Sequence, residues 1–220
     1  MELSKLKKEF ITLLKSTNRE GIDDVLTELE KLGFFEAPAS TKFHLNFKGG
    51  LLQHSLNVCN TALSIREVMI GKDESLRDLL PKESVIIAGL LHDVCKADIY
   101  KSVMKKQKNS FGSWVDVPVY DVDYRNFPLG HGEKSVIVLL QCGLELTDEE
   151  IMAIRWHMHA WDLPFQSADI KGNLLKAKEL YPLVSLIQAA DGLSSNLLLH
   201  RRSSYQLSWS IHLLTIVILW

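Results

Sequence analysis

Apolar residues recur every three or four positions along most of the chain, which is the spacing expected of amphipathic helices. The first two helical stretches contain Leu3, Leu6, Phe10, Leu13 and Leu14, and then Ile22, Val25, Leu26 and Leu29. Gly33 follows the second stretch, where a glycine favours the end of a helix. Further helices are predicted over residues 51–70, 82–96, 132–144, 148–159 and 181–199. The sequence therefore predicts an all-α fold.

Two regions depart from this helical pattern. Residues 34–50 contain Pro, Ser, Thr and a Gly pair, and are predicted to form a loop. Between Lys101 and Leu129, the segment SWVDVPVYDVDY alternates apolar and polar residues and is rich in Val and Tyr. This alternation predicts a short β-hairpin or extended flap inserted between helices. We expect the insert either to border a functional pocket or to be a surface excursion without a role.

The last ten residues, IHLLTIVILW, form a nearly unbroken apolar run. The run is too short to span a bilayer as a helix, so no transmembrane segment is predicted. We expect it to pack either on the rest of the chain or on a second subunit. Packing on a second subunit would make the protein a homo-oligomer. Contact with a membrane surface is the alternative. The charged N-terminal segment lacks the continuous apolar core of a signal peptide.

The charge and cysteine content of the chain argue against several kinds of partner and site. The formal net charge is −2, so there is no global basic field, and no obligate nucleic-acid partner is predicted. Cys59, Cys95 and Cys142 lie far apart, and no CxxC pair occurs. An odd number of scattered cysteines argues against a disulfide framework and against a thiolate zinc site. A reducing environment fits this pattern, so a cytoplasmic location is predicted.

Five segments place histidine or aspartate beside apolar residues. They are GGLLQHSLNV with His54, AGLLHDVCK with His92 and Asp93, LGHGEKS with His131, IRWHMH with His157, and QAADGL with Asp191. An ionised carboxylate in an apolar setting is costly unless it is paired or binds a metal. No Lys or Arg lies one turn from Asp191 on its own predicted helix. A divalent cation would satisfy both Asp93 and Asp191, and imidazole with carboxylate suits Mn, Fe, Zn, Co or Ni better than Mg.

Each of these residues also has a structural interpretation when it is taken alone. A single histidine near a core is usually hydrogen-bonded there, and a single aspartate in a helix is usually a cap or the partner of a distant arginine. The ordered set, with each segment on its own predicted helix, favours a metal site.

In this order, the five segments resemble the HD superfamily of metal-dependent phosphohydrolases over roughly residues 38–198. The opening GGLLQH is most similar to that of 3′–5′ exoribonucleases and of the HD part of some relaxases. The resemblance implies an HD-domain helical bundle over residues 38–200, with the small β-hairpin inserted in it. Residues 1–37 are then expected to form N-terminal helices packed on this core, and residues 201–220 an apolar tail.

The resemblance also implies two sets of metal ligands that share one aspartate. The first metal is held by His54, His92, Asp93 and Asp191, and the second by Asp93, His131 and His157. Members with two metals often carry adjacent histidines where this chain has His157, Met158 and His159. The expected cofactor is therefore one or two divalent ions (Mn, Fe, Ni, Co, Zn or Mg).

Other residues are candidates for contact with phosphate. Lys96 lies one turn past His92, and we expect it to act in catalysis together with Asp93. Substrate contacts are expected from His44, Lys134 and His159. Lys96 and Lys134 have an alternative interpretation as ordinary helix lysines without a role in the site.

The expected reaction is hydrolysis of a phosphomonoester or phosphodiester of a nucleotide or oligonucleotide by a metal-activated water. A 3′–5′ exonuclease acting on RNA or DNA is the first alternative. A metal-binding regulatory module without turnover is the second, and an oxygenase built on the same cluster is a third.

Overall fold

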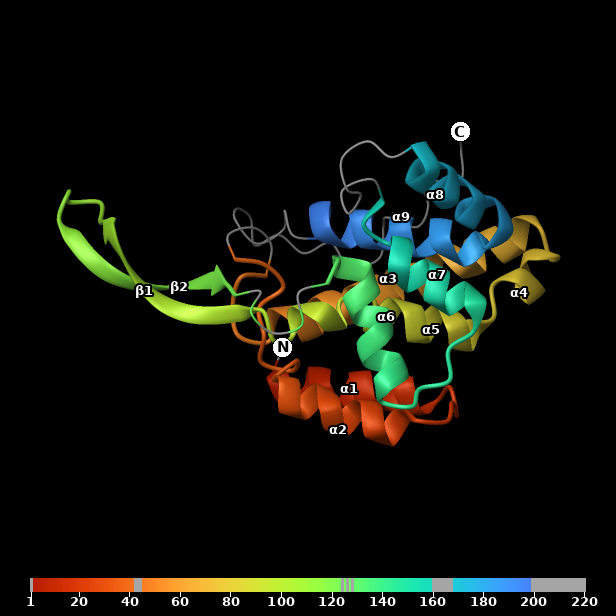
Figure 1. Ribbon diagram of the computed structural model, residues 1–220, viewed down its shortest axis with the longest axis horizontal. Helices are drawn as coiled ribbons and strands as arrows, with labels where there is room; N and C mark the ends of the chain where they lie inside the picture. Colours follow the sequence, from red (N-terminus) through yellow and green to blue (C-terminus); the bar gives the residue numbers. More distant parts are fainter. Residues whose placement is uncertain are drawn as a thin grey trace.

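The computed structural model describes residues 2–41, 45–123, 125, 127, 129–159 and 168–198. Within them the chain is mostly helical, with one two-stranded sheet (Figure 1). In chain order the elements are α1 (Leu3–Lys15), α2 (Ile22–Leu32), α3 (Gly50–Lys72), α4 (Leu76–Leu79), α5 (Lys82–Leu91), the 3₁₀ turn η1 (Val94–Lys96), β1 (Tyr100–Lys108), β2 (Trp114–Val122), α6 (His131–Gln141), α7 (Asp148–Trp156), α8 (Ala168–Leu180) and α9 (Pro182–Asn196). The predicted all-α fold with a small inserted hairpin is confirmed.

Helix α5 lies at the centre of the fold. Its sequence from Ser84 to Leu91 is apolar or small on every side, and all of these residues are buried. A helix that is apolar all round must be covered on all sides, and α5 packs against α1, α3, α7 and α9. The carboxyl end of this covered helix carries His92 and Asp93, so the structure brings two polar side chains into the interior.

Close packing of α3 on α5 depends on Gly89. A Cβ on this residue would lie 2.8 Å from the Cα of Cys59, which is closer than real Cβ contacts come. The absence of a side chain lets the two helix backbones approach each other. This approach brings His54, near the start of α3, up to His92 at the end of α5, with their Nε2 atoms 3.2 Å apart.

The N-terminal helices share the core of the following helices. Helix α1 packs against α2, α3 and α5. The rings of Phe10, Phe34 and Phe35 meet with centroids 5.4–5.6 Å apart. Arg19, in the turn between α1 and α2, forms a bidentate ion pair with the fully buried carboxylate of Glu150 in α7. The division of the chain at residue 37 remains a prediction.

Several elements differ from the sequence prediction. The helix expected over residues 82–96 ends at Leu91, and a 3₁₀ turn begins only after His92 and Asp93. Asp93 has φ −106° and ψ 19°, outside the helical range, so its side chain leaves the helix face that His92 occupies. Helices α4 and α8 were not predicted. In α8, Ala177 is buried whereas Leu175 is exposed, so its apolar periodicity is weak.

The predicted hairpin is present as β1 and β2, which pair antiparallel from Tyr100 opposite Val122 to Lys108 opposite Trp114. It projects away from the helical body (Figure 1), and most of its residues are exposed on both strands. These strands pack mainly on each other, and the expectation that the insert borders a functional pocket stays a prediction.

No helix among the described residues is long and apolar enough to cross a membrane. The apolar run at residues 211–220, and with it the predicted oligomer through residues 201–220, lies outside the described residues.

Candidate metal centre

Five helices supply the side chains of one buried cluster. His54 comes from α3, His92 and Asp93 from the end of α5, His131 from the first position of α6, His157 from the end of α7, and Asp191 from α9. Three triads of these side chains have ligand atoms within 4.8 Å of one another: His54–His92–Asp93, His92–His157–Asp191 and Asp93–His131–His157. All six predicted metal ligands are thus brought together.

Asp93 is at the centre of the cluster, because its two oxygens face different histidines. Oδ2 lies 3.3 Å from the Nε2 atoms of both His54 and His92. Oδ1 lies 2.7 Å from Nε2 of His131 and 3.4 Å from Nε2 of His157. We call these the Oδ2 side and the Oδ1 side of the cluster. Asp191 completes the Oδ2 side, with its Oδ1 atom 3.3 Å from Nε2 of His54.

Two of the histidines are fixed in orientation by backbone carbonyls. His92 Nδ1 donates to the carbonyl of Gly89 at 3.0 Å, and His157 Nδ1 donates to that of Ile154 at 2.7 Å. A carbonyl can only accept, so in the neutral imidazole the proton stays on Nδ1 and Nε2 presents a lone pair. Both lone pairs point towards the carboxylate of Asp93.

His131 is held differently. Its Nδ1 lies 3.4 Å from the Sγ atom of Cys95, a buried thiol. Burial and the nearby Asp93 raise the pKa of this thiol, so it stays protonated and can donate to or accept from the imidazole. The amide of Cys95 donates to Ser135 Oγ at 3.1 Å, which ties the turn after Asp93 to α6.

Gly132 allows α6 and α7 to meet at the cluster. A Cβ on this residue would collide with the backbone of Arg155. Since His131 precedes Gly132 and His157 follows the end of α7, the close approach brings the two ligands of the Oδ1 side together. Their rings have centroids 5.2 Å apart.

The electrostatics favour ionised carboxylates beside neutral imidazoles. Burial lowers the pKa of His92 and of His131 below the ordinary value. For Asp93 burial acts in the opposite direction, but Lys96 and the surrounding histidines outweigh it and hold the pKa well below its usual range. The pKa of Asp191 is likewise lowered despite burial, chiefly by the hydrogen bond with His54.

His54 is the exception among the histidines. Burial, the largest single influence, lowers its pKa, but hydrogen bonds to Asp191 and Asp93 reverse the effect and raise the pKa overall. Its ring therefore lies between two carboxylates that both attract positive charge.

These observations fit a bound cation. In their neutral form the imidazoles of His92 and His157 present lone pairs to the carboxylate of Asp93, and a positive ion between them would turn repulsion into coordination. Nε2 of His157 is buried and, within the described part of the chain, makes no hydrogen bond of good geometry. Imidazole nitrogens and carboxylate oxygens are ordinary ligands of divalent transition metals. The cluster could hold a metal ion.

The other predicted site residues differ in whether they lie at the cluster. Nζ of Lys96 lies 2.7 Å from Asp93 Oδ2, so Lys96 belongs to the cluster. Lys134 is one turn beyond His131, and its ammonium pairs with Asp98 at 2.7 Å. His159 is exposed, has φ +53°, and does not join any of the ligand triads. His44 lies outside the described residues.

A cavity of about 240 Å³ opens beside the Oδ1 side of the cluster. Its lining includes Cys95 and Ile99 from the turn after the cluster, Phe127 and Leu129 from the segment before α6, and His131 and Lys134 from α6. The sequence prediction missed Cys95 and Phe127. Cys95 could have been suspected from its place two residues after Asp93, whereas nothing in the sequence singles out Phe127.

Comparisons with known proteins agree with this geometry. The family model of the HD domain matches residues 51–196. A dihydroneopterin 2′,3′-cyclic phosphate phosphodiesterase from Methanocaldococcus jannaschii is 31% identical over 136 residues, which cover 58% of this chain and 49% of the relative. The chain thus matches about half the length of that curated relative. A search of solved structures gave no significant match. Because the family model matches most of the chain, and the six candidate ligands lie in one cluster, the protein belongs to the HD domain family.

Proposed function

We propose that this protein is a metal-dependent phosphohydrolase that cleaves a phosphomonoester or phosphodiester of a nucleotide-like compound. The observation that carries the proposal is the carboxylate of Asp93, whose two oxygens face separate groups of histidines. One carboxylate shared in this way suits a pair of neighbouring cations, which is a common arrangement in enzymes that hydrolyse phosphate esters.

The identity of the ion is part of the proposal. Bound divalent cations would supply Lewis acidity, which lowers the pKa of water and neutralises charge on phosphate oxygens. His54, His92, Asp93 and Asp191 would hold one ion, and Asp93, His131 and His157 a second. Four histidines in the set favour Mn, Fe, Co, Ni or Zn over Mg.

The protein's own cationic groups can bind the phosphate. The side chain of Lys96 is 12% exposed beside Asp93. Burial, the largest single influence, lowers the pKa of its ammonium, but the charges of Asp93, Tyr100 and Asp191 and the hydrogen bond to Asp93 together outweigh burial and raise the pKa overall. The first amides of α6 provide further positive potential next to His131, since helix N-termini attract anions. A phosphate bound at the cluster would therefore have Lys96 near Asp93 Oδ2 and the α6 terminus near His131.

The relative from Methanocaldococcus jannaschii acts, by its name, on a 2′,3′-cyclic phosphate. We extend this substrate class to the present chain: a cyclic phosphodiester on a ribose-like diol is the favoured substrate. A cytoplasmic location and a homo-oligomer through residues 201–220 stay predictions from the sequence.

The test is hydrolysis by protein stripped of metal with a chelator and then reconstituted. Bis(p-nitrophenyl) phosphate, p-nitrophenyl phosphate and the nucleoside 2′,3′-cyclic phosphates serve as substrates, with Mn²⁺, Co²⁺, Ni²⁺, Fe²⁺, Zn²⁺ and Mg²⁺ added singly. We expect activity to disappear with the metal and to return on reconstitution. Full turnover in the stripped protein would contradict the proposal.

A further inference from the structure

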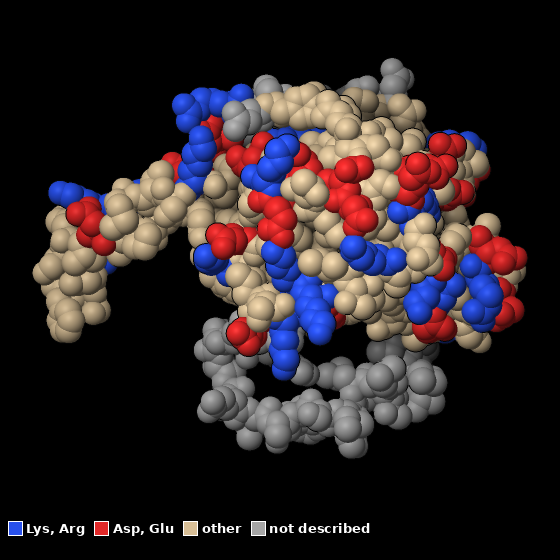
Figure 2. All heavy atoms as spheres, turned by 90° about the horizontal axis from the view of Figure 1, so that it is seen from below, with Lys and Arg blue, Asp and Glu red and all other residues tan. Residues whose placement is uncertain are grey.

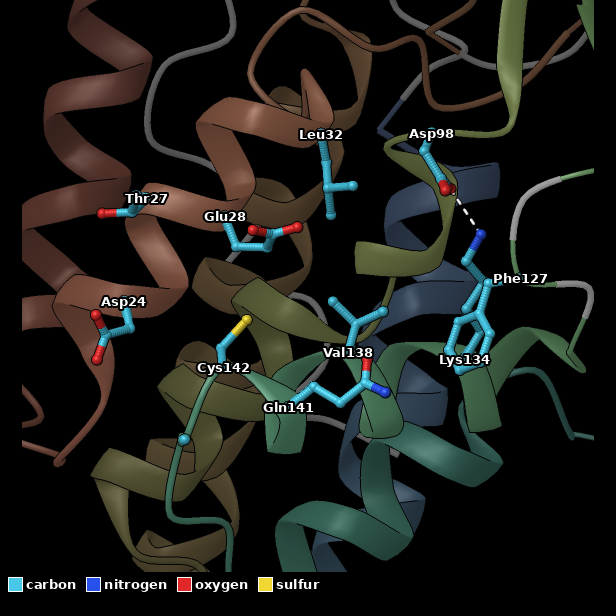
Figure 3. A pocket seen from close by; sticks show the side chains of 11 residues that line it. Asp24, Thr27, Glu28, Leu32, Asp98, Phe127, Lys134, Val138, Gln141 and Cys142 are labelled. Carbon is cyan, nitrogen blue, oxygen red and sulfur yellow. Dashed lines mark hydrogen bonds and ion pairs between the residues drawn. The ribbon is translucent and has the colours of Figure 1, made fainter.

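A second cavity, of about 780 Å³, lies between α2 and α6 (Figure 3). Phe127 and Lys134 line both this cavity and the one beside His131, so the two are neighbours. The walls of the second cavity are α6 on one side, through Val138 and Gln141, and α2 on the other, through Glu28. The two neighbouring cavities therefore extend from a candidate metal ligand along α6.

The dimensions of this space suit part of a small substrate. His131, Lys134, Val138 and Gln141 follow one another at helical spacing, so they share one face of α6. With a rise of about 1.5 Å per residue, Gln141 lies roughly 10 Å beyond Lys134 along the helix. Cavities that bind small molecules commonly measure about 300–1,000 Å³. A compound with its phosphate beside His131 could thus extend into the cavity between α2 and α6.

The charges of the lining exclude a second phosphate. Asp24 and Glu28 project from α2, and on the opposite wall the ammonium of Lys134 is already matched by Asp98 at 2.7 Å. Lys31, the nearest partner of Glu28, is an exposed lysine that binds Oε2 of that carboxylate at 2.6 Å. The face that carries α1 and α2 shows acidic and basic side chains interspersed, without a continuous basic track (Figure 2). A polynucleotide backbone would meet carboxylates here.

An uncharged heterocycle meets complementary groups in the same place. Carboxylates accept hydrogen bonds from N–H groups, and the amide of Gln141 can both donate and accept. Phe127 lines both cavities, with 40% of its surface exposed, and its ring offers a face for stacking. Its φ of +50° is uncommon for a bulky residue, and such backbone is found more often at functional positions.

We propose that the cavity between α2 and α6 holds the heterocyclic base of the substrate, with Glu28 reading N–H donors on its edge and Phe127 stacking on its plane. The inference rests on the proposed function, because it takes the phosphate to lie beside His131. It makes the substrate a single nucleotide-like unit and not an oligonucleotide. Guanine, which presents two adjacent N–H donors to a carboxylate, should fit better than uracil, which presents one.

The experiment compares kcat/KM for guanosine 2′,3′-cyclic phosphate, uridine 2′,3′-cyclic phosphate and bis(p-nitrophenyl) phosphate, using the reconstituted full chain. The variants are Glu28→Gln and Phe127→Ala. Asp23→Asn is the matched control, since Asp23 is an exposed carboxylate on the same helix that does not line this cavity.

In the unaltered protein and in Asp23→Asn we expect guanosine to be preferred over uridine by about tenfold, the value of one good hydrogen bond to a charged group. Glu28→Gln should reduce that preference about tenfold. Phe127→Ala should lower kcat/KM for both cyclic nucleotides about tenfold relative to bis(p-nitrophenyl) phosphate, mainly through KM.

Equal effects of Glu28→Gln and Asp23→Asn, or a Phe127→Ala variant with an unchanged ratio of nucleotide to bis(p-nitrophenyl) phosphate turnover, would overturn the inference and leave the proposed function standing. Efficient cleavage of a short oligonucleotide in preference to the cyclic nucleotides would also overturn it. If none of the phosphodiesters is hydrolysed with any metal, the proposed function itself fails.

Discussion

The residues on the two sides of the Asp93 carboxylate differ in how far they are exposed. On the Oδ2 side, His54 and His92 are almost completely buried within α3 and α5, and Asp191 is 14% exposed on α9. On the Oδ1 side, His131 is 21% exposed, lines the cavity and has its Nδ1 atom 3.4 Å from the thiol of Cys95, whereas His157 is fully buried. Core packing therefore fixes the Oδ2 side and His157, whereas the Oδ1 side is open to an incoming molecule at His131.

This difference suggests a division of tasks. Ligands that are enclosed by helices keep their geometry when a substrate binds, and ligands at the edge of a cavity can contact the substrate directly. Lys96 sharpens the contrast, because its ammonium lies on the Oδ2 side, 2.7 Å from the carboxylate oxygen that a cation would share. The predictions that follow test whether the two sides are joined by Asp93 and whether they respond differently to substitution.

The largest effect is expected from Asp93→Ala. Because both sides share this carboxylate, the variant should bind no Mn²⁺ at micromolar concentration, and hydrolysis should fall at least about 10³-fold. Asp93→Asn, which keeps the shape and removes the charge, should behave similarly. Metal analysis and kinetics measure the losses, and circular dichroism verifies that the helices remain. Normal turnover in either variant would mean that the aspartate is only structural.

Lys96→Met is expected to have a smaller effect, in which Mn²⁺ affinity is retained or increased whereas catalytic activity falls. Removing an ammonium that competes for Asp93 Oδ2 should leave Mn²⁺ binding as tight as before or tighter. Loss of its contact with phosphate should lower kcat/KM by about 10²-fold. Lys82→Met, at the exposed start of the preceding helix α5, is the control. Weaker Mn²⁺ binding in Lys96→Met, measured by calorimetry, would show that the lysine supports the site and does not serve the substrate.

The smallest effect is expected from the thiol that holds His131. Cys95→Ala removes the partner of Nδ1, and outer hydrogen bonds of this kind alter metal affinity by roughly tenfold. Cys95→Ser retains a group that can donate and accept, so it should restore most of the affinity. Titration of metal-free protein with Mn²⁺ measures the change. A serine variant as impaired as the alanine variant would indicate that Cys95 matters for packing alone.

The sequence indicated part of the candidate ligand set because some of these residues are locally conspicuous. The full set followed from the resemblance of the ordered segments to the HD superfamily, and its role in metal binding stays a prediction. His92 and Asp93 interrupt an apolar run, and Asp191 stands in an apolar helix without a neighbouring cation. Helical periodicity is also a local property, which explains why most helices were predicted. The HD domain match confirms the family expected from the ordered segments.

What could not be predicted depends on contacts between distant residues. The end of α5 at Leu91 has no glycine or proline to signal it; the turn is tied instead by the hydrogen bond from Cys95 to Ser135 in α6. Similarly, Lys134 was expected to contact substrate, yet its ammonium pairs with Asp98, thirty-six residues earlier. The cavity between α2 and α6 is made by helices far apart in sequence, so no single segment reveals it.

The number of metal ions bound per chain tests most directly whether Asp93 joins two sites. Metal-free protein is titrated with Mn²⁺, and bound ions are counted by elemental analysis in the unaltered chain, in His131→Ala and in Asp93→Ala. We predict about two Mn²⁺ per chain in the first, about one in the second and none in the third. A count near one in the unaltered chain that does not change in His131→Ala would contradict the account, and would leave His131 as a group that contacts the substrate.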